Sequence, residues 1–348
     1  MRSVWMMLVL QLVIYLTLPT QAVVRPKLQV WFPKHEARWI EQAAACLQEI
    51  RNYLHDNQTP GCTAPCACAA DCILKDLPPT IQSNFASAQV LLGLAPAILV
   101  YFGPTVAEVA ALSTYRPLLA VLLSLGPPAI SIVGLFRYVD LRVPFTQPLS
   151  WNAGLWSTWL GHQGARARRI IQVSSYVVTL AAIANNVHNS VYTDLRTISG
   201  WRCSAMLMPL AWSLLAGVVH AWGMIAIRMQ LGSGYRPSIR SVIRSTTFLD
   251  VLKGADNVLS EALLRLSALC AIIHMGFGIL VLSSLIFISA LEAIQIFVMY
   301  ATSALMCHVV LLTELAMMRY EVSKNEETER SAGPVAMYQV ELSRAHTL

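Results

Sequence analysis

Residues 87–136 form the stretch that decides the fold expected for this chain. They read SAQVLLGLAPAILVYF, then GPTVAEVAALSTYR, then PLLAVLLSLGPPAISIVGLF. The two apolar runs are separated by Gly103-Pro104 and a weakly amphipathic segment, and Gly126-Pro127-Pro128 breaks the second run. Proline removes a backbone donor and interrupts a helix, so the stretch either crosses a bilayer twice or crosses once and turns back.

The composition of the whole chain indicates a membrane protein. Of its 348 residues, 56% are hydrophobic and 13% are charged, against about 25% charged residues in soluble domains. The mean hydropathy is +0.55. We therefore expect an all-α fold, a polytopic membrane helix bundle with a small disulfide-rich N-terminal ectodomain, and the lipid bilayer as partner. The net charge of +6 comes without any nucleic-acid-binding motif, so we expect no nucleic acid partner.

Four parts are expected along the chain. Residues 1–22 resemble a signal peptide, with a positive start, a short apolar core and small residues before the cleavage point; an uncleaved anchor is the alternative. Residues 23–84 form a cysteine-rich exoplasmic segment, and residues 85–318 form a membrane domain of five or six helical spans. Residues 319–348 form a charged, disordered tail. The expected location is multi-pass in the plasma membrane or an endomembrane, with an exoplasmic N-terminus.

The expected exoplasmic segment is rich in cysteine. It contains Cys46, Cys62, Cys66, Cys68 and Cys72. Behind a signal peptide, disulfide bonds explain such a cluster better than a thiolate metal site does. Five cysteines cannot all pair with one another, so a sixth exoplasmic cysteine is needed.

Two arrangements of residues 87–136 are open. Two full crossings would place both basic loops, residues 137–169 and 228–261, outside, which opposes the positive-inside rule. One net crossing places these loops in the cytosol and the loop 192–204 outside, where Cys203 supplies the sixth exoplasmic cysteine. The second arrangement requires half of the stretch to re-enter the membrane or lie flat. Loop charge and cysteine count both favour it.

Three motifs carry a resemblance to a known group of proteins. They are CILKDLPPTIQSNFASAQVLLGLAPAIL, GPTVAEVAALSTYRPLLAVLLSLGPPA and WRCSAMLMPLAW. The region from about residue 62 to residue 227 resembles multispanning membrane proteins of filamentous fungi. That group has no established activity, so the resemblance implies a membrane fold and no catalytic residue.

Three histidines on successive expected spans form a candidate metal or polar site: His220, His274 and His308. Because successive spans run antiparallel, the three fall within about 5 Å of one another along the membrane normal. Histidine, with the nearby thiols of Cys270 and Cys307, can bind zinc, copper or haem iron. The alternative is that each ring hydrogen-bonds a neighbouring helix.

No catalytic motif is present, whether Walker A, GxSxG or HExxH. We therefore expect a non-enzymatic integral membrane protein of the secretory pathway or cell surface, receptor-like or with an assembly role, and no cofactor. The alternative is a transporter or a metal- or haem-binding membrane protein that uses the histidine layer. Bound metal or a haem absorption band in the purified protein would separate the two classes.

Asn57-Gln58-Thr59 is a sequon for N-glycosylation within the expected exoplasmic segment. We expect Asn57 to be glycosylated when the full-length chain is made in eukaryotic cells. Endoglycosidase treatment should increase the gel mobility of the wild type, and the variant Asn57→Gln should show no such change. A wild-type band that the enzyme leaves unchanged would contradict an exposed exoplasmic Asn57.

Overall fold

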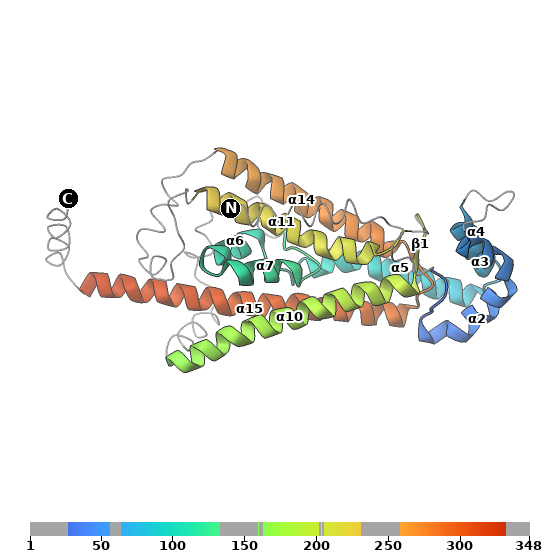
Figure 1. Cartoon of the computed structure of the whole chain (residues 1–348), viewed down its shortest axis with the longest axis horizontal. Coiled ribbons are helices and arrows are strands. Elements are labelled where there is room, and N and C mark those ends of the chain that lie inside the picture. The colour runs from blue at the N-terminus through green and yellow to red at the C-terminus, as the bar shows by residue number, and fades with distance from the viewer. Residues whose placement is uncertain are drawn as a thin grey trace.

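The computed structural model describes residues 27–55, 64–132, 159, 163–201, 203, 205–230 and 258–331. Four helices within these residues are long and apolar enough to cross a membrane. They are α10 (Ala165–Arg196), α11 (Met208–Gln230), α14 (Val258–Ser283) and α15 (Ala290–Ser331). They run lengthwise through the molecule as one bundle (Figure 1), so the chain is an all-α integral membrane protein.

A small helical domain lies at one end of this bundle (Figure 1). Its elements are η1 (Pro33–His35), α2 (Glu36–Ala45), α3 (Leu47–Leu54) and α4 (Pro65–Leu74). Trp39 is fully buried and packs against Phe85 of the bundle and against Phe287. The domain therefore shares its hydrophobic core with the end of the bundle. We call this end of the molecule the outer end and the opposite end the inner end.

The stretch 87–136 forms one long helix followed by two short ones. The helices are α5 (Pro79–Leu99), α6 (Val106–Tyr115) and α7 (Pro117–Leu125). α6 begins with a capping box in which Thr105 and Glu108 hydrogen-bond each other's backbone N–H, and α7 begins at a proline. The amide of Ser131 donates to the carbonyl of Pro104 at 3.0 Å, so the chain returns after α7 to the point where it left α5.

The region that contains this closed loop begins at one end of the bundle and leads to the other end. α5 starts beside the N-terminal domain, whereas α10 starts at the inner end (Figure 1). The starts of α5 and α10 therefore lie at opposite ends of the bundle, which is the arrangement that one net crossing would require. The sequence predicted five or six membrane spans. Among the described residues, four helices are long and apolar enough to cross a membrane, and α5 lies beside them.

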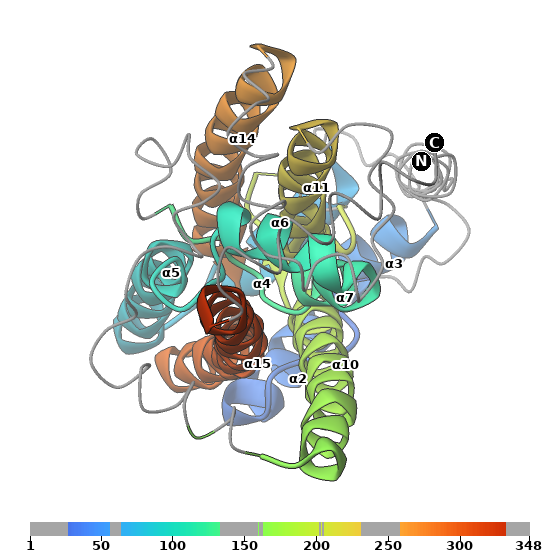
Figure 2. The ribbon, with the colours of Figure 1, turned by 90° about the vertical axis from the view of Figure 1, so that its left-hand side faces the viewer.

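Protein covers the two short helices. Seen along the bundle, α6 and α7 lie in its middle, among α5, α10, α11, α14 and α15 (Figure 2). Most of α6 is buried, including the backbone around its polar residues Ser113 and Thr114. Short helices leave unpaired backbone groups at their ends, and a membrane accepts such ends only where protein surrounds them.

Two short strands close the outer end. β1 (Ile198–Ser199) precedes α11, and β2 (Leu285–Ile286) precedes α15. They pair antiparallel, Ile198 with Ile286 and Ser199 with Leu285. The ladder joins the connections α10–α11 and α14–α15 next to the N-terminal domain.

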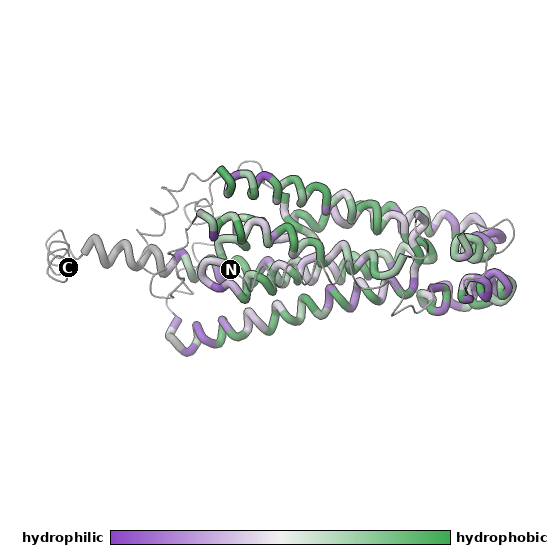
Figure 3. Tube along the Cα trace, turned by 45° about the horizontal axis from the view of Figure 1, so that its top comes forward, coloured by the Kyte–Doolittle hydropathy of each residue, from purple (hydrophilic) through white to green (hydrophobic). Residues whose placement is uncertain are grey.

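Apolar residues make up much of the long helices (Figure 3), and many of their side chains are exposed. Ile170, Val173 and Val177 on α10 are exposed, as are Ile273 on α14 and Val309 on α15. A water-soluble bundle would carry polar residues there, so this surface suits the hydrocarbon of a bilayer.

Two expected boundaries differ from the structure. The limit placed between residues 84 and 85 falls inside α5, and α15 continues to Ser331, thirteen residues beyond the expected end of the membrane domain at 318. Residues 319–331, which the sequence predicted as part of a tail, belong to α15. This segment is rich in Glu, Lys and Arg, which are good helix formers and extend a helix that is already nucleated.

The contact between α6 and α11 provides a test of this packing. A methyl group on Gly223 would collide with Val106 and meet Ala110, whereas one on Gly276 would meet nothing within 4 Å. We expect Gly223→Ala to lower the free energy of unfolding by about 1–3 kcal/mol. The control Gly276→Ala should leave it unchanged or raise it by about 0.5–1 kcal/mol. Thermal unfolding of both variants in detergent measures the difference, and equal midpoints would contradict the packing.

Candidate functional site

Two disulfide bonds tie the outer end together. Cys46 is bonded to Cys72 within the N-terminal domain, and Cys66 is bonded to Cys203 in the α10–α11 connection. Cys203 therefore links the N-terminal domain to the membrane bundle, which is the kind of pairing that the odd cysteine count called for. Cys68 is also disulfide-bonded. Cys62 and Asn57 lie outside the described residues.

A buried ion pair joins the start of the described chain to the outer end of α10. Nζ of Lys27 lies 3.0 Å from Oδ1 of Asp194, and both side chains are almost completely buried. The same Nζ also donates to the carbonyl oxygens of Asp194 at 3.1 Å and Thr197 at 3.3 Å. Burial lowers the pKa of Lys27, and the charge of Asp194 opposes that effect.

Aromatic side chains continue this attachment. Trp31 and Phe32 follow Lys27 and are 5% and 2% exposed. Trp31 packs edge-on against Phe287, and Phe32 packs edge-on against Tyr192 of α10 at 5.6 Å between ring centres. The segment 27–32 is thus anchored by an ion pair and by rings that reach two separate parts of the bundle.

Glu292 connects the N-terminal domain with α15. Its Oε2 accepts hydrogen bonds from the backbone N–H and the hydroxyl of Ser289, which caps the helix. Its Oε1 accepts the backbone N–H of Lys34 at 3.0 Å. The spacing Ser289-x-x-Glu292 is that of a capping box and is visible in the sequence. Lys34 and Glu292 are 258 residues apart, so no local sequence pattern could have predicted their contact.

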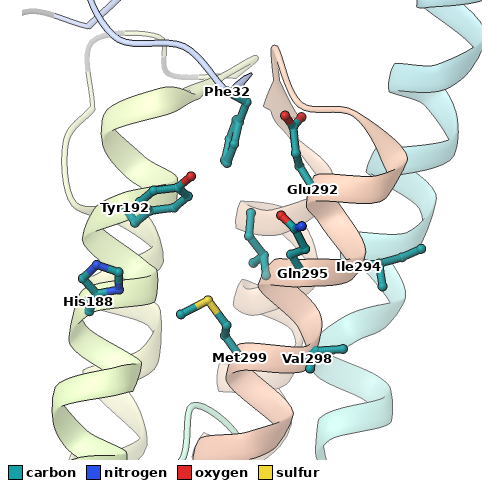
Figure 4. A pocket seen from close by; sticks show the side chains of 9 residues that line it. Phe32, His188, Tyr192, Glu292, Ile294, Gln295, Val298 and Met299 are labelled. Atoms are coloured by element: carbon teal, nitrogen blue, oxygen red, sulfur yellow. The ribbon is translucent and has the colours of Figure 1, made fainter. Parts of the chain in front are cut away.

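A pocket of about 400 Å³ lies where this attachment meets α10 and α15 (Figure 4). Its lining consists of Phe32, His188, Tyr192, Glu292, Ile294, Gln295, Ile296, Val298 and Met299. One wall is formed by α10 and the other by α15, and the Phe32 side chain lies between them at the outer end. Ligand pockets of this size are mostly apolar with a few polar groups, which describes this lining.

Three polar side chains of α10 are stacked one above another, and two of them, His188 and Tyr192, line the pocket. The His188 ring stacks on Tyr192 at 5.9 Å between ring centres. The guanidinium of Arg196 lies 3.8 Å from the centre of the same Tyr192 ring. Residues 188, 192 and 196 are four apart, so the helix places them on one face. Cation–π contact of this kind holds Tyr192 in place.

Below the pocket, α10 and α15 are held together by amides. Nδ2 of Asn185 donates to the carbonyl of Met299 at 2.8 Å, and Nδ2 of Asn189 donates to that of Ile296 at 3.0 Å. Ser190 and Tyr300 form a further hydrogen bond of 3.1 Å between their hydroxyls. Asn185 and Asn189 of α10 thus form contacts between helices.

The three histidines singled out in the sequence do not form a metal site. Among the described residues, no three His, Cys, Asp or Glu side chains are grouped closely enough to hold a metal ion. His274 donates from Nε2 to the Trp212 carbonyl at 2.9 Å and stacks on the Trp212 ring. His220 is fully buried, and His308 is partly buried on α15. His220 and His274 are close enough to interact electrostatically, but the three rings do not form a common group of ligands.

A second ion pair lies at the inner part of the bundle. Nη1 of Arg116, at the turn between α6 and α7, lies 3.2 Å from Oε1 of Glu314 on α15. The Glu314 side chain is fully buried. A lone charge in a membrane bundle is costly, so Arg116 explains why Glu314 is tolerated there.

Comparisons of the chain with protein-family models, with curated proteins and with solved structures find no match.

The ion pair at the outer end gives a direct test of the attachment. Lys27→Met should lower the free energy of unfolding by about 3–5 kcal/mol, because Asp194 then loses the charge that compensates its own burial. The double variant Lys27→Met/Asp194→Asn should lose less than the two single variants together. Chemical unfolding of all four proteins measures the coupling. Additive effects would show that the pair is not formed.

Proposed function

We propose that this chain is a receptor-like, non-enzymatic integral membrane protein whose N-terminal domain lies on the exoplasmic side. In this function, α15 transmits a change at the outer pocket to the inner end of the bundle. The observation that carries the proposal is that α15 contacts the N-terminal domain through Glu292 and the α6–α7 turn through Glu314. One continuous helix therefore connects the pocket with a buried ion pair.

The length of this connection matches a bilayer. Glu292 and Glu314 are 22 residues apart on α15, which corresponds to about 33 Å at 1.5 Å per residue. The hydrocarbon core of a membrane is about 30 Å thick. Packed helices shift as rigid bodies because close-packed interfaces resist gradual deformation. A displacement of α15 at the pocket would therefore reach Arg116.

Charge and disulfide chemistry support the orientation. Arg166, Arg168 and Arg169 stand at the inner start of α10, and Arg228 stands at the inner end of α11. Basic residues mark the cytosolic side of membrane proteins. Disulfide bonds persist on the exoplasmic side, and here they occupy the opposite end. Both arguments support an exoplasmic N-terminal domain, in the plasma membrane or an endomembrane of the secretory pathway.

The two ends of α15 can be tested for coupling. Glu292→Ala removes the bond to Lys34 and the helix cap, and we expect faster hydrogen exchange at the backbone amides of residues 310–320. Glu261→Ala is the control, because it also removes a carboxylate but from an exposed pair with Arg265. Hydrogen exchange read by mass spectrometry, on full-length protein in lipid nanodiscs, reports on both regions.

Exchange that changes at residues 27–45 and not at 310–320 would overturn the transmission role. That result would favour an assembly role, in which the N-terminal domain acts by itself as a docking platform. If Glu261→Ala changed the hydrogen exchange of residues 310–320 as much as Glu292→Ala does, the response would not be specific to Glu292.

A further inference from the structure

One face of α10 carries a buried polar stripe in the outer half of the bundle. Its members follow one another at intervals of three and four positions, which places them on the same side of the helix. They are Asn186, Asn189, Ser190, Thr193 and Asp194, and each is at most 1% exposed. Polar side chains turned into a membrane bundle are costly unless they are hydrogen-bonded, so each of these groups needs a partner.

Four of the five side chains have an oxygen that finds no hydrogen-bond partner in the described part of the chain. These atoms are Oδ1 of Asn186, Oδ1 of Asn189, Oγ1 of Thr193 and Oδ2 of Asp194, and all of them are shielded from bulk solvent. Unpaired buried groups are rare in native proteins. Four of them on one face of one helix indicate that a ligand is bound along this face.

The orientation of the two asparagine amides is fixed by their nitrogens. Nδ2 of Asn186 donates to the Leu125 carbonyl at 3.3 Å, and Nδ2 of Asn189 donates to the Ile296 carbonyl at 3.0 Å. A carbonyl can only accept, so the amide nitrogen has to face it and the amide oxygen has to point elsewhere. Both Oδ1 atoms therefore require a donor from the ligand.

Hydroxyl groups of two other helices lie beside the middle of the stripe. Oγ of Ser190 lies 3.1 Å from the Tyr300 hydroxyl of α15 and 3.4 Å from Oγ of Ser213 of α11. Tyr300 and Ser213 are fully buried. Tyr300 is also close enough to Asp194 to interact electrostatically with it. Three helices thus contribute groups that can donate to or accept from a ligand at the stripe.

The length of the stripe decides which kind of ligand fits it. Asn186 and Asp194 are eight positions apart on α10, which corresponds to about 12 Å. A metal ion holds its oxygen ligands within about 2.0–2.6 Å, so one ion cannot serve both ends. Water molecules bonded to one another stand about 2.8 Å apart, so a row of about three or four covers this length.

The charge of the stripe also favours a neutral ligand. Its one ionisable carboxylate, that of Asp194, already has a countercharge, because Nζ of Lys27 lies 3.0 Å from its Oδ1. The remaining members are amides and hydroxyls, which carry no net charge. A water molecule can donate to an unpaired oxygen and at the same time accept from a hydroxyl, which is what these groups need.

We infer that a row of bound water molecules lies along this face of α10, from Asp194 to the end of α7 at Leu125. The waters donate to the four oxygens and connect them with the hydroxyls of α11 and α15. Lys27 and Thr197, which are 4% and 2% exposed, close the row at the outer end. The bundle thus encloses a hydrophilic path through its outer half. This inference does not depend on the proposed function, because neither Glu292 nor Glu314 takes part in it.

Radiolytic labelling of the full-length protein in nanodiscs, in water that carries heavy oxygen, tests this inference. An X-ray pulse converts bound water into hydroxyl radicals, which oxidise the adjacent side chain even where bulk solvent does not reach it. We expect Tyr300 to be oxidised by this route, and peptide mapping by mass spectrometry measures it. Trp39 is the control and should stay unlabelled, because it is equally buried but packs against the rings of Phe85 and Phe287.

An isosteric substitution separates a hydrated stripe from a dry one. Thr193→Val keeps the shape of the side chain and removes the hydroxyl that holds a water, so the thermal midpoint should fall by about 2–4 °C. Thr179→Val is the matched control on the same helix, since Thr179 is equally buried but donates to the Ser175 carbonyl at 2.7 Å. Both variants should lower the midpoint, and only Thr193→Val should reduce the labelling of Tyr300.

Three outcomes would overturn the inference. A higher midpoint in Thr193→Val would mean that valine has removed an unsatisfied hydroxyl from a dry site. Labelling of Tyr300 in the wild type that is as low as that of Trp39 would show that no water lies beside it. Replacing sodium in the buffer by the bulky cation N-methylglucamine should leave the labelling unchanged, and a loss of labelling would assign the stripe to a bound cation instead of water.

Discussion

The constraint on which this structure depends is that every backbone polar group within the membrane must find a partner in the protein. Residues 103–128 contain two Gly-Pro breaks, so they cannot continue as one long helix. They fold into α6 and α7 instead, and the bond from Ser131 to Pro104 closes them into a loop. The long helices then have to surround this loop, which sets the centre of the bundle.

The outer end depends on the covalent and ionic attachment of the N-terminal domain. Cys66–Cys203 fixes the domain to the α10–α11 connection, and Lys27–Asp194 fixes the preceding segment to α10. A buried pair adds little net stability over apolar packing, but it is strongly selective for one position, since a misplaced segment would leave a buried charge alone. The pocket exists because this segment, through Phe32, stands over the space between α10 and α15.

Polar residues in the membrane domain serve mainly to connect helices. Asn185, Asn189 and Ser190 of α10 each reach α15, and His274 of α14 reaches the backbone of α11. In hydrocarbon, two helices gain little from apolar contact, so such hydrogen bonds and close packing decide which faces meet. The expected histidine layer belongs to this class of contact in the case of His274, while metal chemistry has no set of ligands among the described residues.

The sequence by itself determined the class of this protein and predicted a topology for it. Apolar spans, the breaks at Gly103-Pro104 and Gly126-Pro127-Pro128, basic loops and an odd cysteine count are local or additive properties, and they led to a helical bundle with one net crossing before α10. The tertiary structure alone decided which cysteine meets Cys203, that Lys27 meets Asp194 and that the three histidines do not converge. These facts depend on how helices rotate about their axes and pack, and a helix can turn any of its faces toward a neighbour without changing its hydropathy.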